Sequence, residues 1–324
     1  MPSPEQISRL AGRTGYREET LEKVVRLLDL LAEINRHPFL SHALVLKGGT
    51  ALNLGFGNPR RLSVDLDFNY IGALARMDME RDRPQTQDAV ARIAGAQGYR
   101  IQWSREAHAG RKCFLRYMSV RGAPDRIEID LNFLHRQPLL PVSVRGLWSP
   151  DERASLQVRM LSLEELYAGK ACAMLDRMAP RDLFDMAALP ENAPGLHLSS
   201  IFRAIFIAMS GSLSHPVYSY GRDRARLASE DSVEQQLHPM LIQGETPEPE
   251  ALMRQAWEVM DGLLSLTDIE REFVDRLQAG ELRPELLFPD RADIAGRVGA
   301  HPVLLWKAEN AAMHALRRQR KRQS

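Results

Sequence analysis

The sequence predicts an α+β protein in which a small mixed α/β domain, residues 1–150, precedes a helical domain, residues 151–324. Three observations support this prediction. Runs that alternate polar and apolar residues occur between helical stretches in the first half, and nearly every stretch after Ser162 has helical periodicity. The length of 324 residues also suits two domains, with the loop around Ser149-Pro150 as the expected boundary.

The composition is that of an ordinary globular chain, with 44% hydrophobic residues and 43 Lys+Arg against 42 Asp+Glu. It excludes collagen-like, disordered and disulfide-scaffold classes. No run approaches about 18 consecutive apolar residues, and the first ten residues contain Pro4, Glu5 and Arg9 instead of an apolar signal region. We therefore expect a cytoplasmic protein without a membrane partner. Cys113 and Cys172 are too few for a zinc site or a disulfide framework, and we expect reduced core thiols.

The helical domain ends in a basic tail. Residues 317–324 hold five cations, so removing these five from the formal net charge of +1 leaves −4 for the rest of the chain. Such a run is most often a solvated end, and the alternative is an arm that binds anions. The tail is compatible with a nucleic-acid partner but does not establish one.

The first domain begins with a helical stripe over residues 21–34 and a short apolar run over residues 43–46. That run leads into Lys47-Gly48-Gly49-Thr50. Residues 51–54 predict a brief helix, which the turn formers of residues 55–59 end.

Two polar-faced strands are predicted downstream. Residues 62–70 alternate strictly, which puts Ser63, Asp65, Asp67 and Asn69 on one face. Residues 112–120 and 126–133 read as a hairpin, whose second strand carries Glu128, Asp130 and Asn132 on one face. The remaining expected elements are a helix at 85–97, a strand at 99–104, and helices at 162–177, 180–188, 199–209, 249–265, 268–279 and 303–318.

Asp65 and Asp67 would project from the same strand face with Cβ atoms roughly 7 Å apart. Asp130 on a neighbouring strand would complete a cluster of three, and Glu128 on the same face is the alternative. Like charges this close repel unless a divalent cation neutralises them, and Mg²⁺ prefers such oxygen ligands together with substrate phosphates. A D-x-D pair alone is more often solvated, so the surrounding motifs decide.

The glycine pair lies directly upstream of this strand. Gly48 and Gly49 permit close approach of the backbone to phosphates, and the N–H groups at the start of the following helix are directed at anions. The spacing matches neither the Walker nor the Rossmann glycine motif. By itself the pair is more often a simple turn. Ser63 is a further candidate for a phosphate contact because it shares the face of Asp65.

Lys170 interrupts an apolar helical stripe that follows a capping box at residues 162–165. Such a lysine must extend to solvent, pair with a carboxylate or point into a polar cavity, because burying an unpaired ammonium is costly. Asp182 and Asp185 share one helical face, and they either pair with a nearby arginine or belong to the site.

Together these segments resemble the AbiEii/AbiGii nucleotidyltransferase toxin family, which includes the MenT toxins. The resemblance extends over about residues 46–310. It is carried by KGGTALNL at 47–54, RLSVDLDF at 61–68, LEELYAGK at 163–170, Arg177 with PRDLFD at 180–185, and the segment from His301 to Asn310.

This resemblance implies a mixed-sheet nucleotidyltransferase core of the DNA polymerase beta superfamily with a C-terminal helical domain. It also implies the toxin of a toxin–antitoxin or phage-defence pair, with a cognate antitoxin as partner. The expected reaction is Mg²⁺-dependent transfer of a nucleoside monophosphate from an NTP to RNA, with a tRNA 3′ end as the recipient and release of pyrophosphate.

The expected site has three parts. Asp65, Asp67 and Asp130 would hold a two-metal Mg²⁺ site, and Asp130 would help to activate the attacking hydroxyl. Lys170 would neutralise charge during transfer, and Asp182, or alternatively Asp185, would join the catalytic residues. Nucleotide binding is expected of Lys47, Gly48, Gly49, Thr50, Ser63 and Lys170. The alternatives are nucleotidyl transfer to a protein or small molecule, or a non-catalytic module that binds nucleic acid or the antitoxin.

Overall fold

The computed structural model describes residues 2–56, 59–151, 155–223 and 230–323, and for residues 315–323 it describes the backbone alone. The cations of the basic tail therefore lie outside the described side chains. The chain forms two compact units. The sheet unit comprises residues 1–136, 141–162 and 234–246, and the helical unit comprises residues 137–140, 163–233 and 247–324.

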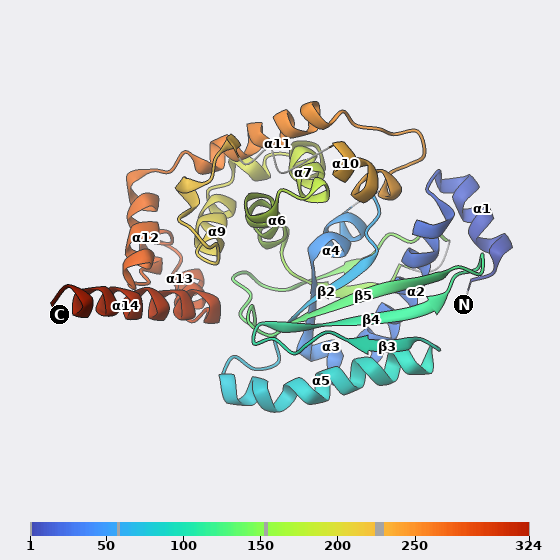
Figure 1. The fold of residues 1–324 in the computed structure, drawn as a ribbon, viewed down its shortest axis with the longest axis horizontal. Helices are drawn as coiled ribbons and strands as arrows, with labels where there is room; N and C mark the ends of the chain where they lie inside the picture. The colour runs from blue at the N-terminus through green and yellow to red at the C-terminus, as the bar shows by residue number, and fades with distance from the viewer. Residues whose placement is uncertain (1, 57–58, 152–154, 224–229, 324) are drawn as a thin grey trace. The chain divides into compact units, whose positions relative to one another are not determined.

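The sheet unit is built on one mixed sheet of seven strands in the order β3-β4-β5-β2-β1-β7-β6. Figure 1 labels β2 to β5 of this sheet. The strands are β1 (Leu44–Lys47), β2 (Asp65–Tyr70), β3 (Arg100–Trp103), β4 (Gly110–Met118), β5 (Pro124–Asn132), β6 (Ser143–Gly146) and β7 (Gln157–Met160). The predicted hairpin is confirmed, because β4 pairs antiparallel with β5. β2 runs parallel to β5 and antiparallel to β1, so both predicted polar-faced strands lie side by side.

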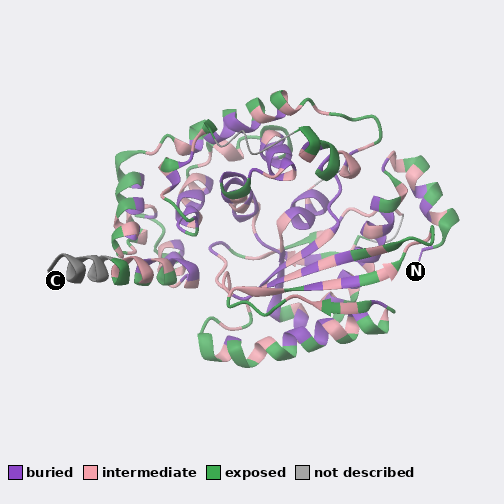
Figure 2. Cartoon of the chain, viewed as in Figure 1, coloured by how far each residue is buried: buried purple, intermediate pink, exposed green. Residues whose placement is uncertain are grey.

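One face of this sheet is apolar and is covered by helices. Cys113, Leu115 and Ile129 are fully buried there. The helices of this unit are α1 (Pro4–Thr14), α2 (Glu18–Arg36), α3 (Leu40–Ala43), α4 (Gly48–Gly55) and α5 (Arg76–Ala96). Arg26 of α2 lies over the ring of Tyr117 on this face, and α5 runs alongside β3 (Figure 1). Figure 2 shows the resulting alternation of buried and less buried positions along β4 and β5.

Two elements depart from expectation. α5 begins at Arg76, whereas the sequence predicted a start at Gln85. The prediction was late because a proline is typical of the first helical turn, and here Pro84 lies inside the helix. The strand expected from residue 62 begins at Asp65, and the segment before it pairs elsewhere: the Leu62 N–H donates to the carbonyl of Met240 at 2.8 Å.

Residues 234–246 return from the helical unit to complete the sheet unit. Leu241 forms a β-bridge with Arg61, and Ile242 forms one with Tyr16. Thr20 of α2 donates its hydroxyl to the carbonyl of Pro239 at 2.7 Å. This return segment therefore joins the start of the chain to the segment that leads into β2.

The helical unit has a core of aromatic side chains, with Phe202, Phe206, Trp257 and Phe273 at most 1% exposed. α6 packs on α9, and α7 packs on α11. Its helices are α6 (Leu163–Arg177), α7 (Pro180–Ala187), α8 (Leu189–Asn192), α9 (Ser200–Ser210), α11 (Pro249–Leu264), α12 (Asp268–Ala279), α13 (Ala292–Gly299) and α14 (Pro302–Gln323), while α10 (Glu230–Gln236) spans the boundary between the units. Among the described residues, no helix combines the length and apolarity needed to cross a membrane.

Candidate active site

The glycine pair forms the junction between β1 and α4. β1 ends at Lys47, Gly48 adopts a left-handed φ of +72°, and α4 starts at once. The Thr50 hydroxyl donates to the carbonyl of Asp65 at 2.5 Å, which attaches the first turn of α4 to the first residue of β2. This hydrogen bond therefore ties the junction directly to the D-x-D strand.

Gly48 and Gly49 both approach β2 and its lead-in too closely for any side chain. A Cβ atom at Gly48 would lie 2.1 Å from Oδ2 of Asp67, and one at Gly49 would lie 2.8 Å from Oγ of Ser63. Arg61 is 1% exposed and lies behind Gly49, with Nη2 at 3.2 Å from the same Cβ position. The predicted glycine, serine and aspartate residues are thus brought together, with the buried guanidinium of Arg61 close to Gly49.

A row of four charges crosses the polar face of the sheet. Strand register aligns Lys112 of β4 with Asp130 of β5, Asp130 with Asp67 of β2, and Asp67 with Lys47 of β1. Neighbouring strands are about 4.8 Å apart, so Asp67 and Asp130 are adjacent. We call these four residues the charged row. Two cations flank two carboxylates in it, which limits the repulsion between the carboxylates.

Glu128 and Asp130, the alternatives for the third carboxylate, have different surroundings. Glu128 aligns with Asp65 and accepts a hydrogen bond from the Lys112 ammonium, whereas Asp130 lies 4.0 Å from that ammonium. Burial raises the pKa of Asp130, and the charges of Asp67 and Glu128 add to the rise against the opposing charges of Lys47 and Lys112. Partial burial alone would lower the pKa of Lys112, but Glu128 and Asp130 raise it.

The donor set of this face suits a hard divalent cation. Asp65, Asp67 and Asp130 offer carboxylate oxygens from two neighbouring strands. Among the described residues, no three His, Cys, Asp or Glu side chains already converge as a metal site. Mg²⁺ is commonly held by one or two carboxylates together with substrate phosphates, so the adjacent pair Asp67 and Asp130 fits this ion.

Lys170 lies in the helical unit and pairs with both candidate aspartates. Its Nζ is 2.8 Å from Oδ1 of Asp182 and 2.9 Å from Oδ2 of Asp185, and Arg177 Nε is 2.7 Å from Asp182 Oδ2. Burial alone would raise the pKa of Asp182, but Lys170 and Arg177 hold it at about 2. Of the three options for this lysine, the structure shows pairing with carboxylates.

The predicted residues are distributed over both units. The sheet unit contains Lys47, Gly48, Gly49, Thr50, Ser63, Asp65, Asp67 and Asp130, and the helical unit contains Lys170, Asp182 and Asp185. Sequence reasoning missed Lys112, although its position in the hairpin opposite Asp130 follows from pairing the two strands about their turn.

Comparison with known proteins identifies the class of this protein as a nucleotidyltransferase. The fold matches MenT4, a nucleotidyltransferase toxin from Mycobacterium tuberculosis H37Rv, with a TM-score of 0.62. The match covers 90% of this chain and 98% of that chain at 16% sequence identity. The family model "Nucleotidyl transferase AbiEii toxin, Type IV TA system" matches residues 29–263. The chain belongs to this AbiEii family, which confirms the resemblance. No curated protein matches the sequence.

Proposed function

We propose that this nucleotidyltransferase toxin of a type IV toxin–antitoxin system transfers a nucleoside monophosphate from an NTP to the 3′ end of an RNA, with tRNA as the recipient. The observation that carries the proposal is the position of Asp67, which lies against Gly48 on one side and in register with Asp130 on the other. One side chain thereby links the glycine junction to a carboxylate pair.

The triphosphate would bind at the junction of β1 and α4. The first N–H groups of α4 have no carbonyl partner within the helix and carry partial positive charge, which favours a phosphate. Asp67 lies against Gly48, Ser63 offers a hydroxyl beside Gly49, and Lys47 supplies a cation next to the glycine pair. Thr50 holds the turn through its bond to Asp65.

Asp65, Asp67 and Asp130 would hold Mg²⁺, which supplies neutralisation of phosphate charge as pyrophosphate departs. The attacking RNA hydroxyl forms a bond to the α-phosphorus while the bond from that phosphorus to the bridging oxygen of pyrophosphate breaks. Asp130 accepts the proton of the hydroxyl. Its raised pKa makes it a better base than an ordinary aspartate, provided that it is ionised.

Lys170 of α6 is the proposed phosphate contact outside the glycine junction. An ammonium has three N–H donors, and among the described residues its acceptors are Asp182 and Asp185. One donor is left for a phosphate oxygen, and the two carboxylates fix the direction of the ammonium. In this proposal Asp182 is a positioning residue.

The family implies an antitoxin partner. We propose further that the pair serves in phage defence and that the toxin acts in the cytoplasm, where NTPs and tRNA occur together.

The test is incubation of the protein with each labelled NTP, Mg²⁺ and total RNA. We expect one or more nucleotides to label tRNA, and the Asp67→Asn variant to lose labelling while remaining folded. Asp88→Asn, an exposed aspartate on α5, is the matched control and should label at the wild-type rate. Label on protein or small molecules would overturn the RNA recipient. Binding of RNA or antitoxin with no transfer and no nucleotide-induced thermal stabilisation would indicate a non-catalytic module.

A further inference from the structure

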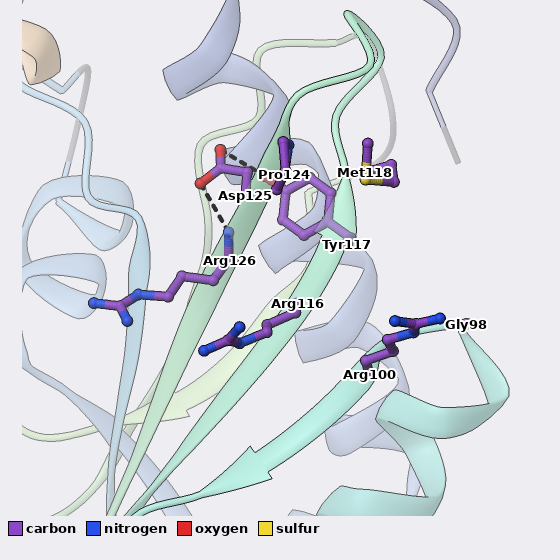
Figure 3. A pocket seen from close by; sticks show the side chains of 8 residues that line it. All are labelled: Gly98, Arg100, Arg116, Tyr117, Met118, Pro124, Asp125 and Arg126. Carbon is purple, nitrogen blue, oxygen red and sulfur yellow. Dashed lines mark hydrogen bonds between the residues drawn. The ribbon is translucent and has the colours of Figure 1, made fainter.

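Three arginines form a second row on the polar face of the sheet, separate from the charged row. Register aligns Arg100 of β3 with Arg116 of β4, and Arg116 with Arg126 of β5. All three are exposed, and alternation along β4 and β5 puts Arg116 and Arg126 on the same face as Lys112 and Asp130. We call Arg100, Arg116 and Arg126 the arginine row (Figure 3).

The arginine row has no counter-charge within the described part of the protein, where none of its guanidinium groups is in an ion pair with a carboxylate. The nearby Asp125 is occupied elsewhere. It accepts hydrogen bonds from the Tyr117 hydroxyl at 3.3 Å and from the backbone N–H of Arg126 at 2.8 Å (Figure 3). It also pairs with Lys23 at 2.8 Å. Like charges opposite one another on neighbouring strands destabilise a sheet. An uncompensated row of three is therefore expected to bind an anion with several charges.

The surroundings of the row provide space and apolar surface. A cavity of about 740 Å³ is lined by the three arginines together with Gly98, Tyr117, Met118, Pro124 and Asp125. Met118 is 59% exposed. The guanidinium of Arg126 also lies 5.1 Å from the ring centre of Phe114, on the same face. Guanidinium groups beside apolar and aromatic side chains suit single-stranded nucleic acid, whose phosphates bind the cations and whose bases pack on the apolar surface.

The distance between the arginine row and the charged row shows whether the arginines could contact the proposed triphosphate. Arg126 and Asp130 are four residues apart on β5, which is about 13 Å along a strand. Arg100 is a further two strands from β5, on the side away from the junction of β1 and α4. The triphosphate proposed at Gly48 would therefore not be the ligand of the arginine row.

We propose that the arginine row binds internal phosphates of a single-stranded segment of the RNA recipient, whose terminal hydroxyl lies at Asp67 and Asp130. This inference rests on the proposed function and adds a second site to it. Arginine suits the role because its planar group binds phosphate in a bidentate manner. The row holds the recipient in register with the carboxylates and takes no part in the chemical step.

The test compares two triple variants with the same change in charge. The first, R100Q/R116Q/R126Q, removes the arginine row. The matched control, R9Q/R92Q/R105Q, removes exposed arginines of α1, α5 and the loop after β3, which likewise have no ion pair within the described structure. Binding of a short fluorescent single-stranded RNA is measured by anisotropy over a range of NaCl concentrations. Each neutralised phosphate contributes about 0.7 to the slope of log affinity against log salt, so loss of three contacts should flatten the slope by about 2.

We expect the control to keep the wild-type slope. In the transfer assay, the row variant should show a raised KM for RNA, with KM for NTP and kcat at saturating RNA unchanged. An equal salt slope in wild type and row variant would overturn the proposal, and so would an equal loss of RNA affinity in both triple variants. In either case, transfer to RNA by the wild type would leave the proposed function intact. Failure of the wild type to bind or label RNA would overturn both. Polyglutamate serves as a probe for an acidic protein partner. If the row variant lost binding to polyglutamate but bound RNA like the wild type, the ligand of the arginine row would be an acidic protein instead of RNA.

Discussion

Gly48 lies so close to the carboxylate of Asp67 that no side chain fits between them. A Cβ atom at Gly48 would lie 2.1 Å from Oδ2 and 2.8 Å from Cγ of Asp67. Gly122, in the turn between β4 and β5, has a similar backbone, with φ of +79° against +72° for Gly48. Nothing lies within 4 Å of a Cβ atom at Gly122. The two glycines thus have the same backbone requirement and differ in their neighbours.

This pair separates backbone strain from displacement of the carboxylate. Gly48→Ala and Gly122→Ala should each lose about 1–2 kcal/mol of unfolding free energy in urea titrations, because both force alanine into the left-handed region. Only Gly48→Ala moves Asp67, so only it should slow nucleotide transfer, by about 100-fold for a displacement near 1 Å. Equal transfer rates in the two variants would show that Asp67 needs no fixed position.

Lys112 should set the acid limit of activity. Its positive charge lowers the pKa of Asp130, which burial raises, so Lys112→Gln raises that pKa further. The proposed base then becomes protonated at higher pH, and the acid limb of the pH–rate profile shifts upward. Glu128→Gln removes a negative charge and should shift the limb downward. Lys23→Gln, which affects the pair with Asp125, is the control and should leave the limb unchanged. Shifts in the same direction for Lys112→Gln and Glu128→Gln would contradict this account.

Asp182 should make the protein sensitive to acid. Its pKa of about 2 in the folded state is below the ordinary value of 3.8, so its stabilising contribution is complete above about pH 4 and is lost as the pH falls towards 2. The shift corresponds to a contribution of about 2 kcal/mol. In Asp182→Asn, the fall in unfolding free energy between pH 5 and pH 2 should be smaller than in wild type by about this amount. Asp290→Asn, at an exposed position, should retain the wild-type fall.

Removing the ammonium of Lys170 should be costly, because it leaves Asp182 and Asp185 buried with one cation fewer. We expect Lys170→Met to lose about 3–5 kcal/mol of unfolding free energy. Adding Asp185→Asn should recover part of that loss, since it removes one unbalanced charge. A double-mutant cycle in urea measures the coupling, and no recovery in the double variant would show that the pair does not interact energetically. The stabilised double variant also permits a test of triphosphate binding without the lysine.

Sequence alone determined the local geometry of the site. Strict alternation at residues 62–70 and 126–133 predicted that Asp65, Asp67 and Asp130 lie on polar strand faces, and the observed register agrees, because side chains of a strand alternate with period two. The Gly48-Gly49 pair indicated either an approach to phosphate or a turn, and Gly48 has a left-handed φ, as turns commonly require of glycine. These features depend on neighbours within a few residues, which a sequence displays directly.

Tertiary structure decided which of these local features meet. The parallel register of β2 and β5 puts Asp130 opposite Asp67 and Glu128 opposite Asp65, a pairing that the sequence did not predict. The fold also pairs Lys170 with both Asp182 and Asp185. In the sheet, strand register aligns three arginines from three strands. Strand register is selected by burial of the whole apolar face, so shifting one strand would move every side chain on it at once. No short segment of sequence contains that information, since the partners lie in distant parts of the chain.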